Sequence, residues 1–293
     1  MIEEATNGRV KVTIFPGNTL VPQPEQYRAV QEGICDVLWV YQSYAPGAMP
    51  TSDLFMLPGL FPNMATSNVV LNMLFAEFPA FTDEMSPKVK HIASQVMLRA
   101  DLHSTHPIRN LDDLQGKIIG CQDEMSARAL SLAGASTSTM TLDEMYTAGE
   151  RGMVDGIVVA WGAFFVWKLY EVYDYHTVLG LSPVPSHWMF NRDTWNKFTP
   201  DEQQKLELLG PWFQRAINEA AGMPGMLARG TEVTPDKGHE IIEWSTEDMN
   251  ELRETFKPIW DKWVEDMEAK GIPGNDILKR ALQLLDSYGY RFG

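Results

Sequence analysis

The sequence has little of what marks a disulfide-stabilised or nucleic-acid-binding protein. Its 293 residues include two cysteines, Cys35 and Cys121, too few for a disulfide framework and too isolated for a zinc site. We predict that both are small buried hydrophobic residues. Basic residues are also few: 24 Lys and Arg against 39 Asp and Glu give a net charge of −15. This charge opposes binding to nucleic acid or anionic lipid.

Signatures of catalysis, bound cofactors and membrane insertion are missing too. Gly-x-Gly-x-x-Gly after a strand, Gly-x4-Gly-Lys-Ser/Thr, Gly-x-Ser-x-Gly and His-Glu-x-x-His do not occur, and each of these patterns carries a chemistry. His103 and His106 are close in sequence, but no Cys or carboxylate pair stands beside them at ligand spacing. No apolar run reaches the roughly 18 to 20 residues of a membrane span. We predict no cofactor, no metal site and no enzymatic activity.

The residues that are present predict an α/β protein. The chain is 44% hydrophobic, and its short apolar strands alternate with helices, which favours parallel sheets with helices on both faces. The last third is mainly helical, and we expect the aromatic stripe of its helix over 246–270 in the core. Strands are expected over 9–15, 35–41, 90–98, 117–121, 156–160, 176–181, 187–191 and 238–244. Helices are expected over 2–6, 24–32, 65–78, 124–133, 142–151, 162–172, 200–231, 246–270 and 275–288.

Local signals explain several charged residues and glycines without a catalytic role. Three carboxylate pairs stand at or near expected helix N-termini, where the helix dipole favours negative charge. We interpret them as structural rather than as general acids and bases. Gly156 begins a strand, and we expect its backbone to approach a neighbouring strand closely. The three carboxylate pairs are Asp112–Asp113, Asp123–Glu124 and Asp143–Glu144.

Seven short motifs occur in an order that is typical of one family. Each motif is weak alone, but together they span about residues 1–200, and the chain is similar to the solute-binding protein of a tripartite ATP-independent periplasmic (TRAP) transporter, the DctP-like family. The motifs are Thr6–Val12 (TNGRVKV), Ala29–Gly33 (AVQEG), Tyr44–Pro46 (YAP), Leu111–Lys117 (LDDLQGK), Glu144–Tyr146 (EMY), Gly152–Gly156 (GMVDG) and Leu169–Val172 (LYEV).

The resemblance implies a two-lobe, periplasmic-binding-protein-like α/β fold with a hinge, an interlobe cleft and a long helix crossing both lobes. Lobe I would hold residues 1–97 plus 186–226, and lobe II residues 98–185 plus 227–293. A small organic acid would close the lobes, and the TRAP membrane subunits would be the partners in the periplasm. Residues Met1 to Gly8 lack the regions of a signal peptide. On the family pattern the first strand is missing before Met1, so we expect an incomplete start and a lost leader.

The chain departs from the family at two ligand positions. Most members have an Arg at the end of the strand after the Asp-Leu-x-Gly turn, where it clamps a carboxylate. Gly120 stands there, one residue before Cys121 and two before Gln122, and Val159 replaces an Asn that is usual in the family. A carboxylate in the usual pose would lose its main partner. The resemblance implies that Arg99, before Pro107, is the remaining anchor.

Aromatic side chains cluster at the strand ends that the resemblance assigns to the cleft. Trp161 follows one such strand, and Trp39, Tyr41 and Tyr44 surround the end of another. With space opened by Gly120, they suggest a wide pocket that stacks a ring, so we expect an aromatic or bulky acid. The remaining ligand-binding candidates are Gln122, Val159, the polar contacts Tyr146 and His187, and Phe61 as a wall.

Two other readings stay open. A sensory module could use the same fold to signal to a partner domain. An enzyme of the same shape could use Asp155 or Glu144 as a base, although nothing in the sequence positively supports it.

Overall fold

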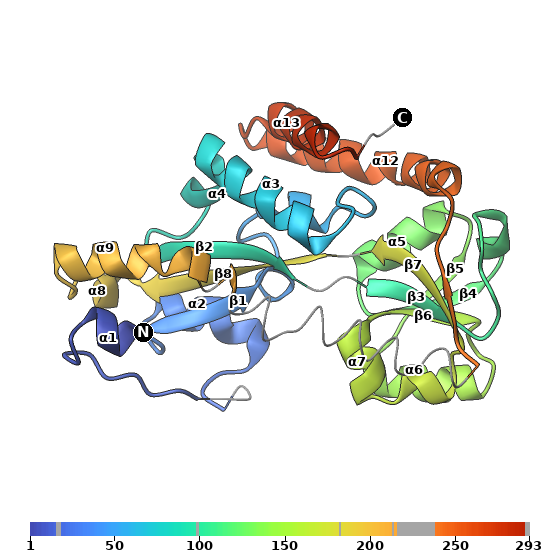
Figure 1. Cartoon of the computed structure of the whole chain (residues 1–293), viewed down its shortest axis with the longest axis horizontal. Coiled ribbons are helices and arrows are strands. Elements are labelled where there is room, and N and C mark those ends of the chain that lie inside the picture. Colours follow the sequence, from blue (N-terminus) through green and yellow to red (C-terminus); the bar gives the residue numbers. More distant parts are fainter. Residues whose placement is uncertain (16–18, 98–99, 182, 213, 216–237, 291–293) are drawn as a thin grey trace.

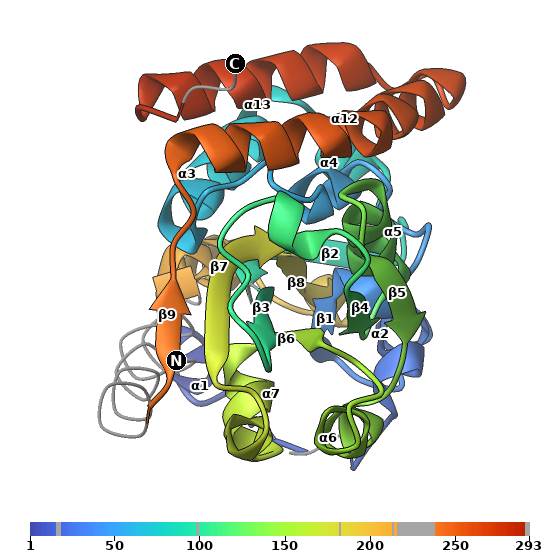
Figure 2. The ribbon, with the colours of Figure 1, turned by 90° about the vertical axis from the view of Figure 1, so that its right-hand side faces the viewer.

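Two sheets lie end to end, and helices surround both of them (Figure 1). The computed structural model describes residues 1–15, 19–97, 100–181, 183–212, 214–215 and 238–290. Figure 2, viewed from the side of the six-stranded sheet, shows α12 and α13 above that sheet and α6 and α7 below it. The mixed α/β architecture with two lobes confirms the predicted fold class.

The smaller sheet has three strands in the order β1-β8-β2, with β8 antiparallel to both neighbours. Helices α2 and α3 pack on it, and α8 and α9 follow β8. Its strands are β1 (Val37–Tyr41), β2 (Val89–Met97) and β8 (Val184–Asn191). The helices of this part are α1 (Ile2–Ala5), α2 (Gln26–Gln31), α3 (Met64–Glu77), α4 (Ala80–Asp83), α8 (Arg192–Trp195) and α9 (Pro200–Leu208).

The larger sheet has six strands in the order β5-β4-β6-β3-β7-β9. β4 is parallel to β5 and β6, and β7 is parallel to β9, whereas β3 is antiparallel to β6 and β7. Its strands are β3 (Ala100–Ser104), β4 (Ile118–Cys121), β5 (Ser136–Thr139), β6 (Gly156–Ala160), β7 (Tyr175–Leu181) and β9 (Glu240–Ile242). Its helices are α5 (Glu124–Leu132), α6 (Leu142–Glu150) and α7 (Trp161–Val166).

The expectation of parallel sheets is therefore wrong for the smaller sheet and holds only in part for the larger sheet, which is mixed. The reason lies in the two crossings between them. β2 ends at Met97 and β3 begins at Ala100, and β7 ends at Leu181 and β8 begins at Val184. After each crossing the chain enters the other sheet at the edge where neighbouring strands of that sheet end. The entering strand, β3 or β8, therefore runs antiparallel to those neighbours.

The long helix α12 (Thr246–Ala269) lies over both parts of the molecule (Figure 1). It packs against α5 and against α13 (Gly274–Ser287), which in turn packs on α3. Trp260 Nε1 donates to the carbonyl of Pro58, and Trp263 Nε1 to that of Pro50, both at 3.0 Å. The aromatic stripe on this helix is buried, which confirms its predicted place in the core.

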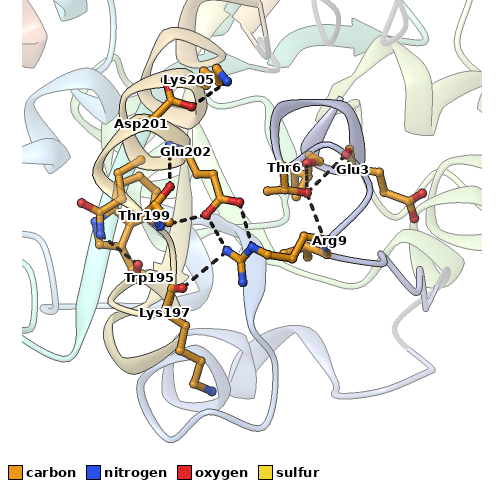
Figure 3. Close-up of polar contacts among 12 residues, drawn as sticks. Glu3, Thr6, Arg9, Trp195, Lys197, Thr199, Asp201, Glu202 and Lys205 are labelled. Carbon is orange, nitrogen blue, oxygen red and sulfur yellow. Dashed lines mark hydrogen bonds and ion pairs between the residues drawn. The ribbon is translucent and has the colours of Figure 1, made fainter.

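The expected strand over 9–15 does not form. No strand of the described residues pairs with this segment, and without a partner its backbone groups have no ladder. Val12, Ile14 and Phe15 are exposed as a result. The start of the segment is held differently: the Arg9 guanidinium pairs with Glu202 at the first turn of α9, with Nε at 2.9 Å from Oε1 (Figure 3).

Glu202 serves two partners at once. It forms a capping box with Thr199, whose backbone N–H donates to Oε2 at 2.8 Å, and it also pairs with Arg9 (Figure 3). These contacts lower the pKa of Glu202 to about 2, with the hydrogen bond from Arg9 as the largest cause. The pair ties the N-terminal helix α1 to α9 across a long sequence separation.

Other local predictions are confirmed. Both cysteines are buried. A Cβ on Gly156 would lie 2.9 Å from the backbone oxygen of His103, the close approach expected at the start of that strand. Asp123 caps α5 by accepting from the backbone of Ser126, and Glu144 completes a capping box with Thr141.

Gly149 gives a stability prediction. A Cβ at this position in α6 would lie 2.2 Å from the hydroxyl oxygen of Tyr173, a buried side chain that donates to the carbonyl of Met145. We expect Gly149→Ala to lower the free energy of unfolding by about 2 kcal/mol, since overpacking outweighs the gain in helix propensity. Urea unfolding measures this. Adding Tyr173→Phe should recover part of the loss, and full stability of the single variant would contradict the packing.

Candidate functional site

The two sheets present strand ends to each other, and we call these ends the facing edges. In the larger sheet, the end of β6 at Ala160 pairs with the start of β3 at Ala100, which also pairs with the end of β7. In the smaller sheet, Tyr41 ends β1 and pairs with Ser186 near the start of β8. Because the two crossings join these ends directly, the first residues after β1, β4 and β6 lie toward the opposite sheet.

Trp161 forms the aromatic part of the larger sheet's facing edge. It begins α7 immediately after β6. Its indole Nε1 donates to Oδ2 of the buried Asp101 at 2.9 Å, and its ring meets those of His103 and His176 at centroid distances of 4.7 and 5.0 Å. The indole therefore has a fixed orientation before any ligand arrives.

Three aromatic side chains come from β1 and the turn that follows it, at the smaller sheet's facing edge. Trp39 and Tyr41 point to one face of the strand, with ring centroids 4.9 Å apart, and Tyr44 meets Tyr41 edge-on at 6.1 Å. Trp39 also stacks on Trp188 of β8 at 5.7 Å. Burial raises the pKa of Tyr41. Tyr44 remains 37% exposed and is the member of this row that a solute can reach most easily.

The two positions that depart from the family lie in packed surroundings. A Cβ on Gly120 would be 2.7 Å from Met140 Sδ and 3.2 Å from Ile157 Cγ2, so the expectation that Gly120 opens space is wrong. Met140 takes that volume instead. Val159 is fully buried in the core beneath α7. Gln122 is exposed just beyond β4, and Arg99 lies outside the described residues.

His187 is fully buried and faces the interior of the smaller sheet. Gln42 Nε2 donates to the Met49 carbonyl and to Asp53 Oδ1, so its Oε1 is left to accept from His187 Nε2 at 3.1 Å. His187 Nδ1 then accepts from Ser94 Oγ at 2.7 Å. Burial lowers the pKa of His187 to about 3. Both ring nitrogens are therefore engaged within the protein.

Two further candidates lie away from the facing edges. Phe61 is buried and borders a cavity of about 360 Å³ between the loop before α3, β7 and the start of α12. Tyr146 on α6 donates its hydroxyl to Glu171 Oε2 at 2.9 Å. The structure thus brings Tyr41, Tyr44 and Trp161 to the facing edges, while Phe61 and Tyr146 face other parts of the molecule.

The carboxylates of the enzyme hypothesis have structural partners. Asp155 Oδ2 accepts from the backbone N–H of Ile118 at 2.8 Å, and Glu144 is engaged in the cap of α6. Within the described ranges, no group of three His, Cys, Asp or Glu side chains could hold a metal ion. No helix in that part of the chain is long and apolar enough to cross a membrane.

Sequence reasoning missed Asp101, which orients the Trp161 indole, and Gln42, which accepts from the buried His187. Both are buried polar residues, at 5% and 1% exposure. Nothing in their sequence neighbourhoods distinguishes them, because Trp161, Gly180 and His187 are all distant in sequence from the residue they contact.

One family model matches most of the chain. The model named DctP, described as bacterial extracellular solute-binding protein, family 7, matches residues 1–266. The chain belongs to this family. Members of the DctP family are solute-binding proteins of transport systems and not enzymes.

Two relatives are similar to this chain over much of its length. The chain is 27% identical over 216 residues to the uncharacterized protein YiiZ of Salmonella typhimurium. This match covers 70% of this chain and 64% of that protein. It is 24% identical over 296 residues to the 2,3-diketo-L-gulonate-binding periplasmic protein YiaO of Escherichia coli. This match covers 95% of this chain and 83% of that protein.

Solved structures share the fold. A TRAP periplasmic solute-binding protein from Desulfovibrio salexigens, in an open complex, has a TM-score of 0.87 at 25% identity and covers 98% of this chain and 88% of its own. A second TRAP periplasmic solute-binding protein, from Bordetella bronchiseptica with bound (R)- and (S)-mandelate, has a TM-score of 0.77 at 23% identity. The match covers 98% of this chain and 91% of that protein.

Proposed function

We propose that this chain is the extracytoplasmic solute receptor of a TRAP transporter. It binds a small organic acid between the facing edges in the periplasm and delivers it to the membrane subunits. The observation that carries the proposal is the pair of aromatic walls, Tyr41 and Tyr44 on one edge and Trp161 on the other. Membership of the DctP family supports it.

The division into lobes follows the two sheets. We assign residues 1–97 plus 186–226 to lobe I and 98–185 plus 227–293 to lobe II. Sheet membership supports this division, since β1, β2 and nearly all of β8 fall in lobe I and the six strands of the larger sheet fall in lobe II. In this proposal the crossings from β2 to β3 and from β7 to β8 form the hinge between the two lobes.

An aromatic acid is the proposed solute class. Flat rings stack favourably on aromatic side chains, and both walls offer them. Arg99 supplies the cation for the carboxylate, since its planar fork matches a carboxylate bidentately. The mandelate-bound relative supports this class, whereas the diketogulonate-binding relative shows that the family also takes acids without an aromatic ring. Mandelate and succinate are therefore the discriminating probes.

Tyr44→Ala tests the aromatic wall. We expect the dissociation constant for mandelate to rise about tenfold, the effect of one lost aromatic contact of ~1.4 kcal/mol. Isothermal titration calorimetry measures it. Tyr288→Ala is the matched control, because Tyr288 is a similarly exposed tyrosine at the end of α13, 50% exposed against 37% for Tyr44. Equal affinities for the two variants would remove Tyr44 from the site.

A further inference from the structure

Asp101 joins two elements that meet at the hinge. It lies on β3 and is 5% exposed. Its Oδ2 accepts from Trp161 Nε1 and its Oδ1 from the backbone N–H of Gly180, both at 2.9 Å. One carboxylate thereby links the aromatic wall after β6 to strand β7 on the opposite side of β3.

The bond to Gly180 exists because β7 is irregular at this point. Ala100 pairs with Leu181, but Leu102 pairs with Thr177. One residue of β3 is thus opposite three residues of β7, and Gly180 takes a φ of +63° within this bulge. A bulge removes an N–H from the ladder, and the Asp101 carboxylate accepts from it instead. One residue after Gly180, β7 ends at Leu181, and the chain continues toward β8.

The other neighbours of the Trp161 ring are neutral. His103 Nε2 donates to the carbonyl of Val159 at 3.2 Å, so in the neutral ring its Nδ1 accepts from His176 Nδ1 at 2.9 Å. Burial keeps the pKa of both imidazoles low. These rings support the indole by packing alone. The charged hydrogen bond to Asp101 is what fixes its rotation.

We propose that Asp101 is a positioning residue that determines the preference for flat, ring-shaped acids. It holds the Trp161 indole as a rigid wall and anchors that wall to the bulge before the hinge crossing. A rigid wall favours a ligand that matches its plane, because less side-chain freedom is lost on binding. A flexible linear acid gains little from it. This inference rests on the proposed function of the same site.

A double-mutant cycle tests the inference. The variants are Asp101→Ala, Trp161→Phe and the pair, with dissociation constants for mandelate and succinate measured by calorimetry. We expect Asp101→Ala to raise the constant for mandelate about tenfold, the order of one lost hydrogen bond to a charged group, and that for succinate less than twofold. In the Trp161→Phe background the indole N–H is gone, so Asp101→Ala should have no further effect on mandelate.

Asp101→Asn covers the case in which the alanine variant does not fold. Asparagine retains one acceptor for two donors, and an intermediate loss for mandelate is expected. Equal losses for both acids, or an unchanged Asp101 effect in the Trp161→Phe background, would overturn the positioning role. If the wild-type protein binds neither these acids nor others, the proposed receptor function fails. That result differs from a failure of the positioning role, in which the wild-type protein still binds mandelate.

Discussion

Replacing Arg99 by alanine is expected to weaken the binding of an aromatic acid about 100-fold. A bidentate charged hydrogen bond contributes ~1.5–3 kcal/mol, and its loss leaves the ligand carboxylate without its main partner. Arg99 itself lies outside the described residues. It belongs, however, to the crossing between Met97 and Ala100, which joins the two facing edges. Gly120 has no side chain to replace it.

Calorimetric titration of mandelate measures this effect. Arg151→Ala is the matched control, because Arg151 is an exposed arginine at the C-terminal end of α6, where removal of one cation changes the net charge equally. Arg99→Lys should recover only part of the affinity, since an ammonium cannot form the planar fork. Unchanged binding by Arg99→Ala would place the carboxylate elsewhere.

Acid is expected to unfold the protein steeply below pH 6.5. Burial lowers the pKa of His91 to about 4, of His176 and His187 to about 3, and of His103 well below its usual range. Because these folded-state values lie below the unfolded value of 6.5, the unfolded chain binds the extra protons. Stability is therefore full above pH 6.5 and is lost as the pH falls, by up to ~1.4 kcal/mol per pH unit for each histidine.

Glu84 acts in the opposite direction. Burial raises its pKa to about 7, although it accepts from the backbone of Thr51 and Ser52. The contribution of Glu84 to folded-state stability is full below pH 4.5 and is lost as the pH rises through 7. Asp53 acts in the same direction as Glu84, because burial also raises its pKa. With four histidines against two carboxyl groups, we expect the free energy of unfolding to fall by roughly 2 to 4 kcal/mol between pH 6 and pH 5.

Urea unfolding at a series of pH values checks this slope. His176→Asn should reduce this slope by about one proton. A free energy of unfolding that does not change between pH 7 and pH 5 would contradict the neutral, buried state of these histidines.

The sequence predicted the elements whose own residues carry a strong pattern. The helix over 246–270 has apolar residues at helical spacing, and α12 covers Thr246–Ala269. The strand over 156–160 is a continuous apolar run and is β6. In contrast, β5 reads Ser-Thr-Ser-Thr and β3 reads Ala-Asp-Leu-His-Ser. Their polar residues are held in the sheet by neighbouring strands, which a local pattern cannot reveal.

For the candidate site too, residues with a local sequence signal could be predicted and residues held by distant partners could not. Tyr41, Tyr44 and Trp161 could be named as candidates because they end or closely follow apolar strands. Gly120 was misread, because the residue that occupies the nearby volume, Met140, comes from beyond another helix. The role of Asp101 depends on a bulge in β7. Gly180 inside the strand pattern is a sequence signal for a bulge, but nothing in the sequence pairs it with Asp101.

The most direct test of the central claim is equilibrium binding of mandelate and succinate to the wild-type chain by titration calorimetry. A receptor for aromatic acids should bind mandelate at a stoichiometry of one, at least about tenfold more tightly than succinate, the difference of ~1.4 kcal/mol expected from one ring contact. Tighter binding of succinate, or mandelate binding that is indifferent to both Arg99→Ala and Tyr44→Ala, would contradict it.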